Sequence, residues 1–559
     1  MIQAMRSSSF NKLVLFTLIF ILVIAINPLV VDAQVWQWSV LFKNARPDAE
    51  ESRAFMWIPE NCKKVKGVIL AQNNMEELSI LENANFRKQL TKLGFAEIWV
   101  TPPFDHLFRF NEGAGETFNN IISSLANNSG YEELKFAPVV PIGHSAAASW
   151  PYYFAVWKPE RTLCAISVSG QWPYFRDPKF APDIWEDKTL DFIPCLETMG
   201  EYEAANTWSS EGLKERTEHK YLALSMLACP AEGHFASTDK KADYIGFYIK
   251  KAVQYRFSNK TDEKGYPDLN IIDPRTTGWL SDKWRLNQLP ITTAAPVNKY
   301  KGDKNEAFWY FDEEMAKATE TYQASYRNKK AELVGYSQAG ELVKQKNTHL
   351  QVTLRFITEN DGISFKLKGC FLDTVPAIST RLTEWTKIPV DSPIGHAKGN
   401  IPVNIERIAG PFKKINDSIF QLCLDKSIKR NSKNYSLIFA SMHSGDENYK
   451  PAVQQAEMNV PVTNNFGIEQ SITFNAIERV NTTVKSIDLK ATSSAGLPVS
   501  YYILEGPAEI QDNKIVFTSI PPQSKFPIRV TVVAWQYGKC SEPKVKTAAS
   551  VSQTFFIDN

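Results

Sequence analysis

Residues 136–157 read FAPVVPIGHSAAASWPYYFAVW, and this stretch decides the fold prediction. The apolar run 137–142 is typical of a buried strand, and residues 146–157 are expected to form a helix. Between them stands the pentapeptide GHSAA, with Ser145 at its centre. Small residues two positions before and two after a serine let the backbone turn sharply and project the hydroxyl into a cleft. The usual pattern has glycine where this chain has Ala147, which is the mildest possible departure.

Short apolar runs and helical stretches alternate around this turn over residues 34–257. Further strands are predicted at 66–72, 95–101, 162–168, 192–199 and 221–228, and further helices at 81–93, 116–125 and 243–255. Such alternation predicts an α/β fold, with a mainly parallel sheet and helices on both faces. Ligands of these sheets bind at the carboxyl ends of the strands. We therefore expect the functional site at the edge where Ser145 follows its strand.

A serine hydroxyl is barely nucleophilic near neutral pH, so Ser145 needs a base. The chain has seven histidines, and His234 is the best placed of them. It stands in the segment PAEGHF, after the apolar run 222–228 and before the last helix of this region. His144 adjoins the serine, but neighbouring side chains diverge on such a turn. The other histidines are His106, which precedes the serine, His219 in a charged run, and His349, His396 and His443 in the later β-rich region.

The base in turn needs a carboxylate that orients its ring and stabilises the imidazolium. The strand 192–199 is followed by the segment GEYE, which offers Glu201 and Glu203. Asp177 follows the preceding strand. Each of the three can also be a surface carboxylate, because acidic residues are mostly exposed in folded proteins. The residues themselves leave this choice open.

Residues 34–257 resemble the α/β-hydrolase superfamily in the segments GHSAA, GEYE and EGHF, which follow one another in the chain order serine, acid, histidine. The resemblance implies a catalytic triad of Ser145, Glu203 and His234. It ranks Glu201 second and Asp177 third as the acid, because the family's acid lies a few residues beyond its strand.

The resemblance also implies an oxyanion hole with two donors. One is the backbone N–H of Ala146, and the other comes from the loop after strand 66–72, where Asn73 and Asn74 are the candidates. Two more loops at the same edge place aromatic beside polar residues, as sugar or aryl-ester pockets often do. They carry the candidate substrate-binding residues Phe104, His106, Gln171 and Trp172, for which ordinary loop packing is the alternative.

The composition and the hydrophobic pattern of the chain change beyond residue 257. Residues 258–460 are predicted to form a polar linker followed by a β-rich middle domain, with one helix around 308–331. Residues 461–559 have the strand spacing of a β-sandwich. Within them the segment ATSSAGLPVSY, residues 491–501, resembles a strand–turn–strand of bacterial Ig-like modules.

The first 33 residues are expected to be a signal peptide. Basic residues without acids precede an apolar run at 13–31, and Val31 and Ala33 supply small residues at the cleavage positions. An uncleaved membrane anchor is the alternative. No later segment is apolar for long enough to span a membrane, so we expect a secreted or periplasmic protein with no membrane span after cleavage.

Composition and motifs exclude several classes of function. A formal net charge of +2 gives no field that argues for nucleic acid. No zinc, dinucleotide or calcium motif is present, so no cofactor and no metal are expected. The seven cysteines are sparse, and Cys164, Cys195 and Cys229 lie in apolar runs that favour buried thiols.

These features predict a serine hydrolase that cleaves carboxylic esters through an acyl-enzyme. With its expected secretion and its appended β-rich domains, the chain resembles exported bacterial carbohydrate esterases. This resemblance implies an ester-bearing glycan as substrate. Two alternatives stay open: a glycan-binding or surface protein whose hydrolase domain is inactive, and a serine peptidase on the same fold.

Overall fold

The computed structural model describes residues 35–43, 51–175, 185–235, 238–345, 351–377, 386–399, 401–428 and 432–559. The predicted signal peptide and the third candidate acid, Asp177, lie outside these residues. Residues 35–559 belong to one contact unit. Within the described part of the chain, no helix combines the length and the apolar character that crossing a membrane requires.

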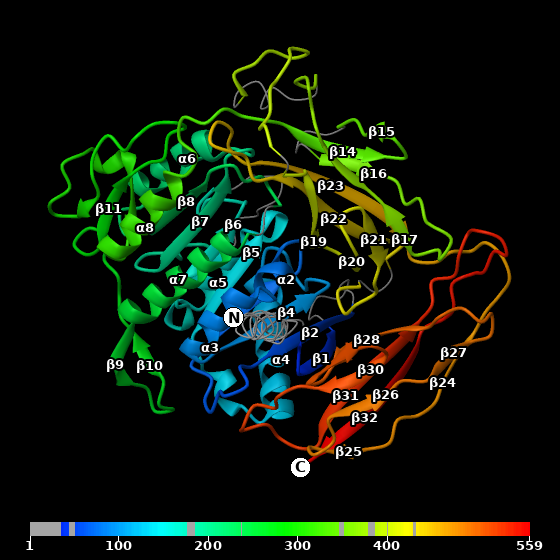
Figure 1. Ribbon diagram of the computed structural model, residues 1–559. Coiled ribbons are helices and arrows are strands. Elements are labelled where there is room, and N and C mark those ends of the chain that lie inside the picture. The colour runs from blue at the N-terminus through cyan, green and yellow to red at the C-terminus, as the bar shows by residue number, and fades with distance from the viewer. Residues whose placement is uncertain are drawn as a thin grey trace, which may run out of the picture. The chain divides into compact units, whose positions relative to one another are not determined.

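The central sheet has eight strands in the order β1-β2-β4-β3-β5-β6-β7-β8 (Figure 1). They are β1 (Trp38–Lys43), β2 (Glu51–Trp57), β3 (Gly67–Gln72), β4 (Phe95–Thr101), β5 (Val139–His144), β6 (Ala165–Val168), β7 (Pro194–Gly200) and β8 (Ala223–Cys229). β1 and β2 are antiparallel to their neighbours, and every pairing from β4 to β8 is parallel. This parallel-rich sheet confirms the predicted α/β class and fits the α/β-hydrolase fold.

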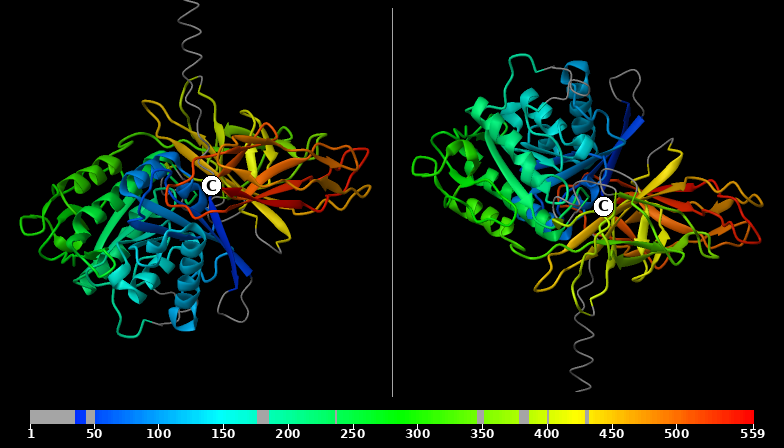
Figure 2. Two further views of the ribbon diagram at one scale, coloured as in Figure 1. Left: turned by 90° about the horizontal axis from the view of Figure 1, so that it is seen from below. Right: turned by 90° about the horizontal axis from the view of Figure 1, so that it is seen from above.

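Helices lie on both sides of this sheet (Figure 2). They are α2 (Glu77–Leu81), α3 (Ala84–Leu93), α4 (Ala114–Ser129), α5 (Trp150–Trp157), α6 (Ala205–Glu218) and α7 (Asp239–Arg256). α3 packs against α7, begins at the side-chain cap of Asn83 and ends at Gly94 in the left-handed conformation. Because both faces are covered, every residue of β3 to β8 is buried, which explains their continuous apolar runs.

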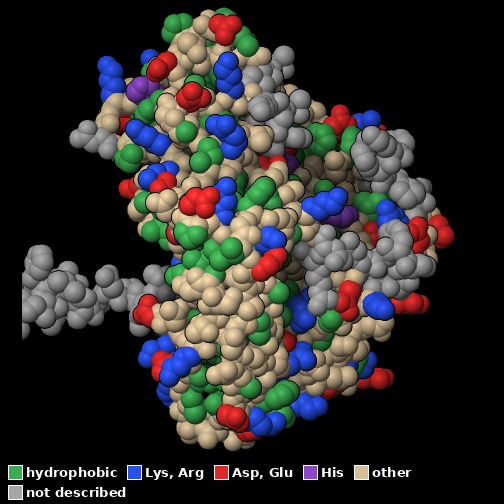
Figure 3. Space-filling view, turned by 90° about the vertical axis from the view of Figure 1, so that its right-hand side faces the viewer, with side chains coloured by type: hydrophobic (Ala, Val, Ile, Leu, Met, Phe, Trp, Pro, Cys, Tyr) green, Lys and Arg blue, Asp and Glu red, His purple; other side chains and the backbone are tan. Residues whose placement is uncertain are grey.

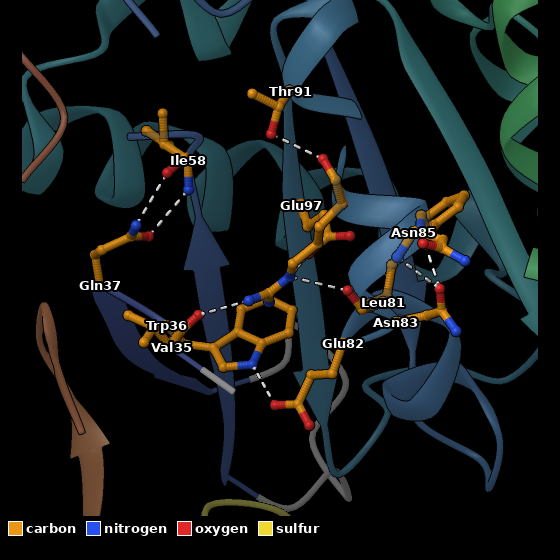
Figure 4. Close-up of polar contacts among 12 residues, drawn as sticks. Val35, Trp36, Gln37, Ile58, Leu81, Glu82, Asn83, Asn85, Thr91 and Glu97 are labelled. Atoms are coloured by element: carbon orange, nitrogen blue, oxygen red, sulfur yellow. Dashed lines mark hydrogen bonds and ion pairs between the residues drawn. The ribbon is translucent and has the colours of Figure 1, made fainter. Parts of the chain in front are cut away.

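A buried ion pair ties the start of the described chain to the sheet (Figure 4). Arg87 Nε lies 2.9 Å from Glu97 Oε2 on β4, and another guanidinium nitrogen donates to the backbone oxygen of Val35 at 3.1 Å. Burial raises the pKa of Glu97 to about 8, and Arg87 opposes that rise. Trp36 Nε1 donates to Glu82 Oε1 at 2.8 Å. The residues before β1 are therefore held by polar contacts to α3 and to the turn that precedes it.

The hydrophobic core of this sheet continues to Tyr322, beyond residue 257, where the catalytic unit is predicted to end. The added elements are β9 (Phe257–Thr261), β10 (Pro267–Leu269), β11 (Trp279–Asp282), β12 (Ala295–Pro296), β13 (Ala307–Tyr310) and α8 (Glu313–Gln323). β13 lies beside β8, and the Tyr310 hydroxyl donates to the backbone oxygen of Met226 at 2.7 Å. The stretch predicted as one helix around 308–331 thus divides into β13 and the shorter α8.

A β-rich region with its own core follows. Its strands are β14 (Val334–Gln338), β15 (Glu341–Leu342), β16 (Gln351–Leu354), β17 (Ser364–Lys366), β18 (Lys368–Phe371), β19 (Asn404–Ala409), β20 (Phe412–Lys414), β21 (Ile419–Leu422), β22 (Asn434–His443) and β23 (Ala452–Pro461). The main sheet has the order β16-β23-β22-β19, and β17-β21-β20 form a second sheet. Phe365, Leu437 and Phe439 are fully buried in the core of this middle region.

The last region also has its own core, around Val530, Val532 and Phe555. Its strands are β24 (Ile472–Phe474), β25 (Val480–Asn481), β26 (Ser486–Asp488), β27 (Ala491–Ser493), β28 (Ser500–Glu505), β29 (Ala508–Gln511), β30 (Lys514–Phe517), β31 (Ile528–Trp535) and β32 (Val551–Asp558). They form the sheets β25-β32-β31-β28 and β26-β30-β29 and the pair β24-β27. The Ig-like character of this region stays a prediction.

Positively and negatively charged side chains are mixed on the face drawn in Figure 3. Lys and Arg alternate there with Asp and Glu, and no large area carries a single sign. The described surface on this side therefore presents a mixed rather than a one-signed field.

Candidate active site

Ser145, His234 and Glu203 meet at the carboxyl edge of the sheet, although 89 positions separate the first two in the sequence. His234 Nε2 lies 2.8 Å from Ser145 Oγ. The other ring nitrogen, Nδ1, lies 2.7 Å from Glu203 Oε1. A hydroxyl, an imidazole and a carboxylate joined in this order form the relay that activates a serine nucleophile.

The turn that carries Ser145 is strained, as a sharp strand-to-helix turn requires. The serine has a φ of 55°, in the left-handed region that residues with a side chain seldom adopt. A Cβ at Gly143 would clash with the backbone oxygen of Ala147, so only glycine fits at that position. Ala147, which stands where the usual pattern has glycine, is fully buried.

The acid and the histidine come from the ends of the neighbouring parallel strands β7 and β8. Gly200 ends β7, and a Cβ there would lie 2.6 Å from the backbone oxygen of Glu232. The two loops can therefore approach closely only because residue 200 is glycine. The backbone N–H of Tyr202 donates to the same Glu232 oxygen at 2.9 Å, which fixes the acid loop to the histidine loop.

A buried glutamate that the sequence analysis missed organises the opposite side of the site. The Glu77 carboxylate accepts the backbone N–H groups of Asn74, Met75 and His144 at 2.8–2.9 Å. Burial raises the pKa of Glu77 to about 7, and these hydrogen bonds oppose that rise. One carboxylate thereby holds the loop after β3 against the residue that precedes the nucleophile.

His144 and Glu76 form a second buried group behind His234. His144 Nε2 lies 2.9 Å from the backbone oxygen of His234 and 3.4 Å from Glu76 Oε2. Burial lowers the pKa of His144 well below its usual value, so the ring is neutral and can donate to that carbonyl. Burial raises the pKa of Glu76 to about 7. His144 therefore contacts the backbone of His234, the residue whose ring lies against Ser145 Oγ.

The predicted oxyanion donors differ in what they already bind. Ala146 is exposed in the 3₁₀ turn Ser145–Ala147, where the first N–H groups lack partners within the helix. Asn74 donates its backbone N–H to Glu77 and its side-chain amide to the His144 oxygen at 3.1 Å. Asn73 donates its backbone N–H to Val100 at 2.8 Å. Of the two asparagines, only Asn73 keeps a side-chain amide without a hydrogen-bond partner among the described residues.

The predicted substrate-binding aromatics belong to the core instead. Trp172 is 0% exposed and stacks on Trp208 and Phe308. Phe104 is buried against Phe42 and Phe108. The burial of these two rings lends no support to their predicted role, which stays a prediction. His106 is exposed and Gln171 is partly exposed, so their predicted role is not decided by burial.

Glu201, the second candidate acid, has a structural partner from the middle region. Its carboxylate forms an ion pair with Lys450, and both side chains are only 3% exposed. The other carboxylate oxygen accepts the backbone N–H of Ala231 at 2.9 Å. The Tyr202 hydroxyl donates to the backbone oxygen of Pro451. The segment between β22 and β23 therefore contacts the loop that carries Glu203, and Glu201 of that loop in turn binds the loop that carries His234.

One face of the middle sheet packs directly on those loops. Tyr202 and Phe235, the neighbours of Glu203 and His234, share a buried apolar cluster with residues of β19, β22 and β23. The residues from the middle sheet are Ile408, Ile438, Ala440 and Val453. The middle region is thus part of the wall of the site, a question that the sequence left open.

Nothing in the described residues suggests a bound metal, since no group of three or more His, Cys, Asp or Glu side chains there could hold one. The described cysteines are all unpaired, with Cys164, Cys195 and Cys229 buried as predicted.

No protein-family model and no curated protein matches this chain. Solved structures match about two fifths of it. Est1E from Butyrivibrio proteoclasticus is 12% identical, with 39% of this chain and 99% of that chain covered and a TM-score of 0.27. An S-formylglutathione hydrolase from Agrobacterium tumefaciens is 11% identical, with coverages of 39% and 94% and a TM-score of 0.30. A poly(3-hydroxybutyrate) depolymerase, LpqC from Bordetella parapertussis, is 11% identical, with coverages of 40% and 89% and a TM-score of 0.29.

Proposed function

We propose that this protein is a secreted serine hydrolase that cleaves carboxylic esters through an acyl-enzyme. The observation that carries the proposal is the contact chain from Ser145 Oγ to His234 Nε2 at 2.8 Å and from His234 Nδ1 to Glu203 Oε1 at 2.7 Å. The strained φ of the serine and its place after a parallel strand support the same assignment.

In the acylation step, Ser145 Oγ attacks the acyl carbon while His234 Nε2 takes the hydroxyl proton. Glu203 holds the Nδ1 proton and stabilises the imidazolium. The backbone N–H of Ala146 and the side-chain amide of Asn73 donate to the oxyanion, and each such donor contributes about 10²–10³-fold to kcat. The carbon–oxygen bond to the alcohol then breaks, and His234 gives the proton to the departing oxygen.

In the deacylation step, water attacks the acyl-enzyme as His234 takes one of its protons. The bond between the acyl carbon and Ser145 Oγ breaks, the same proton returns to that oxygen, and a carboxylic acid leaves. We further propose that the alcohol is a glycan, on the basis of the expected secretion and the two appended β-rich regions.

A fluorophosphonate probe tests the central claim. The probe should label the protein at Ser145, and Ser145→Ala should abolish both labelling and the turnover of 4-nitrophenyl acetate. Ser149→Ala is the matched control, because Ser149 lies at the start of α5 and its side chain makes no capping hydrogen bond. Unchanged turnover in Ser145→Ala would refute the assignment. Binding of a polysaccharide with no ester cleavage by the parent protein would favour the inactive glycan-binding alternative.

A further inference from the structure

A cavity of about 390 Å³ opens between the loop after β3 and the middle sheet. The first region contributes Asn73 and Asn74 to its wall, together with Ser79 of α2. The middle region contributes Arg407 and residues of β22 and β23. α2 and β19 lie side by side at this place (Figure 1). The volume falls in the range of about 300–1,000 Å³ that small-molecule pockets occupy.

The cavity adjoins the relay through the two asparagines. Asn74 Nδ2 donates to the backbone oxygen of His144, the residue before the nucleophile. Asn73 lines the cavity and is only 8% exposed, and its side-chain amide has no hydrogen-bond partner among the described residues. This amide is therefore available to hydrogen-bond a polar ligand or water in the cavity.

The face of β22 that looks toward the first region changes character along the strand. Ile438, Ala440 and Met442 pack on the loops of the relay. Two and four residues before Ile438, in the same alternation, Ser436 and Asn434 are exposed and line the cavity. Asn459 of β23 is the register partner of Ser436 and is also exposed. The middle sheet is thus apolar where it closes against the catalytic loops and polar where it borders the cavity.

The polar lining matches hydroxyl groups in particular. Asparagine amides and serine hydroxyls donate as well as accept hydrogen bonds, and so does every sugar hydroxyl. Among the described residues that line the cavity there is no carboxylate, and the exposed Lys433 makes no ion pair with any described residue.

We propose that this cavity is a glycan subsite, which binds sugar units of the alcohol part of the ester while the ester bond lies at Ser145. The proposal rests on the proposed function and deepens it, because it assigns part of the substrate specificity to the middle region. Asn434 and Asn459 are the residues of that region that contact the sugar. A small ester without a glycan would leave the subsite empty.

The test compares two substrates in variants of the middle sheet. Asn459→Trp fills the cavity from an exposed position, and the double variant Asn434→Ala/Asn459→Ala removes two amides. For acetylated xylo-, manno- and pectic oligosaccharides we expect KM to rise about tenfold or more. For 4-nitrophenyl acetate we expect kcat/KM to stay within about twofold. Thr492→Trp is the control, since Thr492 is an exposed strand residue of the last region.

The outcomes separate the two proposals. If parent and variants have equal KM values for the oligosaccharides, the subsite proposal is overturned. If the probe still labels Ser145 in that case, the serine hydrolase assignment stands. Absence of labelling and of all turnover would instead refute the hydrolase. In that case, calorimetric titration of the same oligosaccharides into the parent protein and into the Asn459→Trp variant tests whether the cavity binds glycans. Binding that is lost in Asn459→Trp supports it, and equal binding or no binding overturns it.

Discussion

Removing Lys450 should destabilise the protein and damage the relay together. Lys450 lies in the middle region, 249 positions from its ion-pair partner Glu201, which stands two residues before the proposed acid. In Lys450→Met the carboxylate keeps only its hydrogen bond from the Ala231 N–H as a described partner. A charge left buried without its counter-ion costs about 3–5 kcal/mol.

The expected shift in melting temperature follows from the size of the unit. Residues 35–559 unfold with an entropy of roughly 1.1 kcal/mol/K, at about 2.1 cal/mol/K per residue. A loss of about 3–5 kcal/mol therefore lowers Tm by roughly 3–5 °C. Because Glu201 and Glu203 share one turn after β7, displacement of that turn also moves the acid, and a shift of about 1 Å costs on the order of 100-fold in turnover.

Calorimetry and the turnover of 4-nitrophenyl acetate measure the two effects. The double variant Lys450→Met/Glu201→Gln should recover most of the stability, because glutamine is neutral and can still accept the Ala231 N–H. Lys413→Met is the matched control, since Lys413 is exposed on β20 and makes no ion pair with a described residue. A Tm within about 1 °C of the parent in Lys450→Met, or no recovery in the double variant, would show that this reasoning is wrong.

Three further predictions concern the site itself. Glu203→Gln should lower kcat about 10⁴-fold in steady-state assays with little change in Tm, and a loss below tenfold would exclude it as the acid of the relay. Asn73→Ala should lower kcat about 10²–10³-fold and Asn74→Ala clearly less, because the Asn74 amide already binds His144; the reverse order would contradict the assignment of the second donor. Burial raises the pKa of Glu76 from 4.5 to about 7, so the stability from its bound proton is complete below pH 4.5 and is lost as the pH rises through 7. Urea titrations should therefore find Glu76→Gln gaining about 3 kcal/mol relative to the parent between pH 4.5 and 8, and a constant difference would count against this titration.

Local patterns in the chain were sufficient to predict the sheet and to propose Ser145 and His234, whereas the choice of Glu203 as the acid came from the resemblance to α/β-hydrolases. A buried strand, a tight turn of small residues and a helix are each specified by neighbouring residues, so the stretch around Ser145 could be interpreted without tertiary information. The parallel order then brings the carboxyl ends of β5, β7 and β8 to one edge. That is why His234 and the candidate acids Glu201 and Glu203 could be proposed from their positions after strands.

Contacts between distant segments were beyond such reasoning. Trp172 follows a strand as a binding residue would, but Phe308 covers its ring, and no local pattern indicates that partner. The end of the first core at Tyr322 was likewise missed, because residues 258–295 have the composition of a linker although Tyr266, Leu280 and Trp284 belong to that core.

The sequence by itself determined where the strands, turns and helices around the site lie, and therefore which polar residues follow each strand. It could do so because strand, turn and helix propensities act over a few residues. Only the tertiary structure decided what each polar group does there. Glu201 and Glu203 stand in the same four-residue turn, yet one meets Lys450 and the other His234. Asn73 and Asn74 are neighbours, yet one amide binds His144 and the other lines the cavity. The physical reason is that a buried polar group must find a partner, and the partners here come from segments far along the chain.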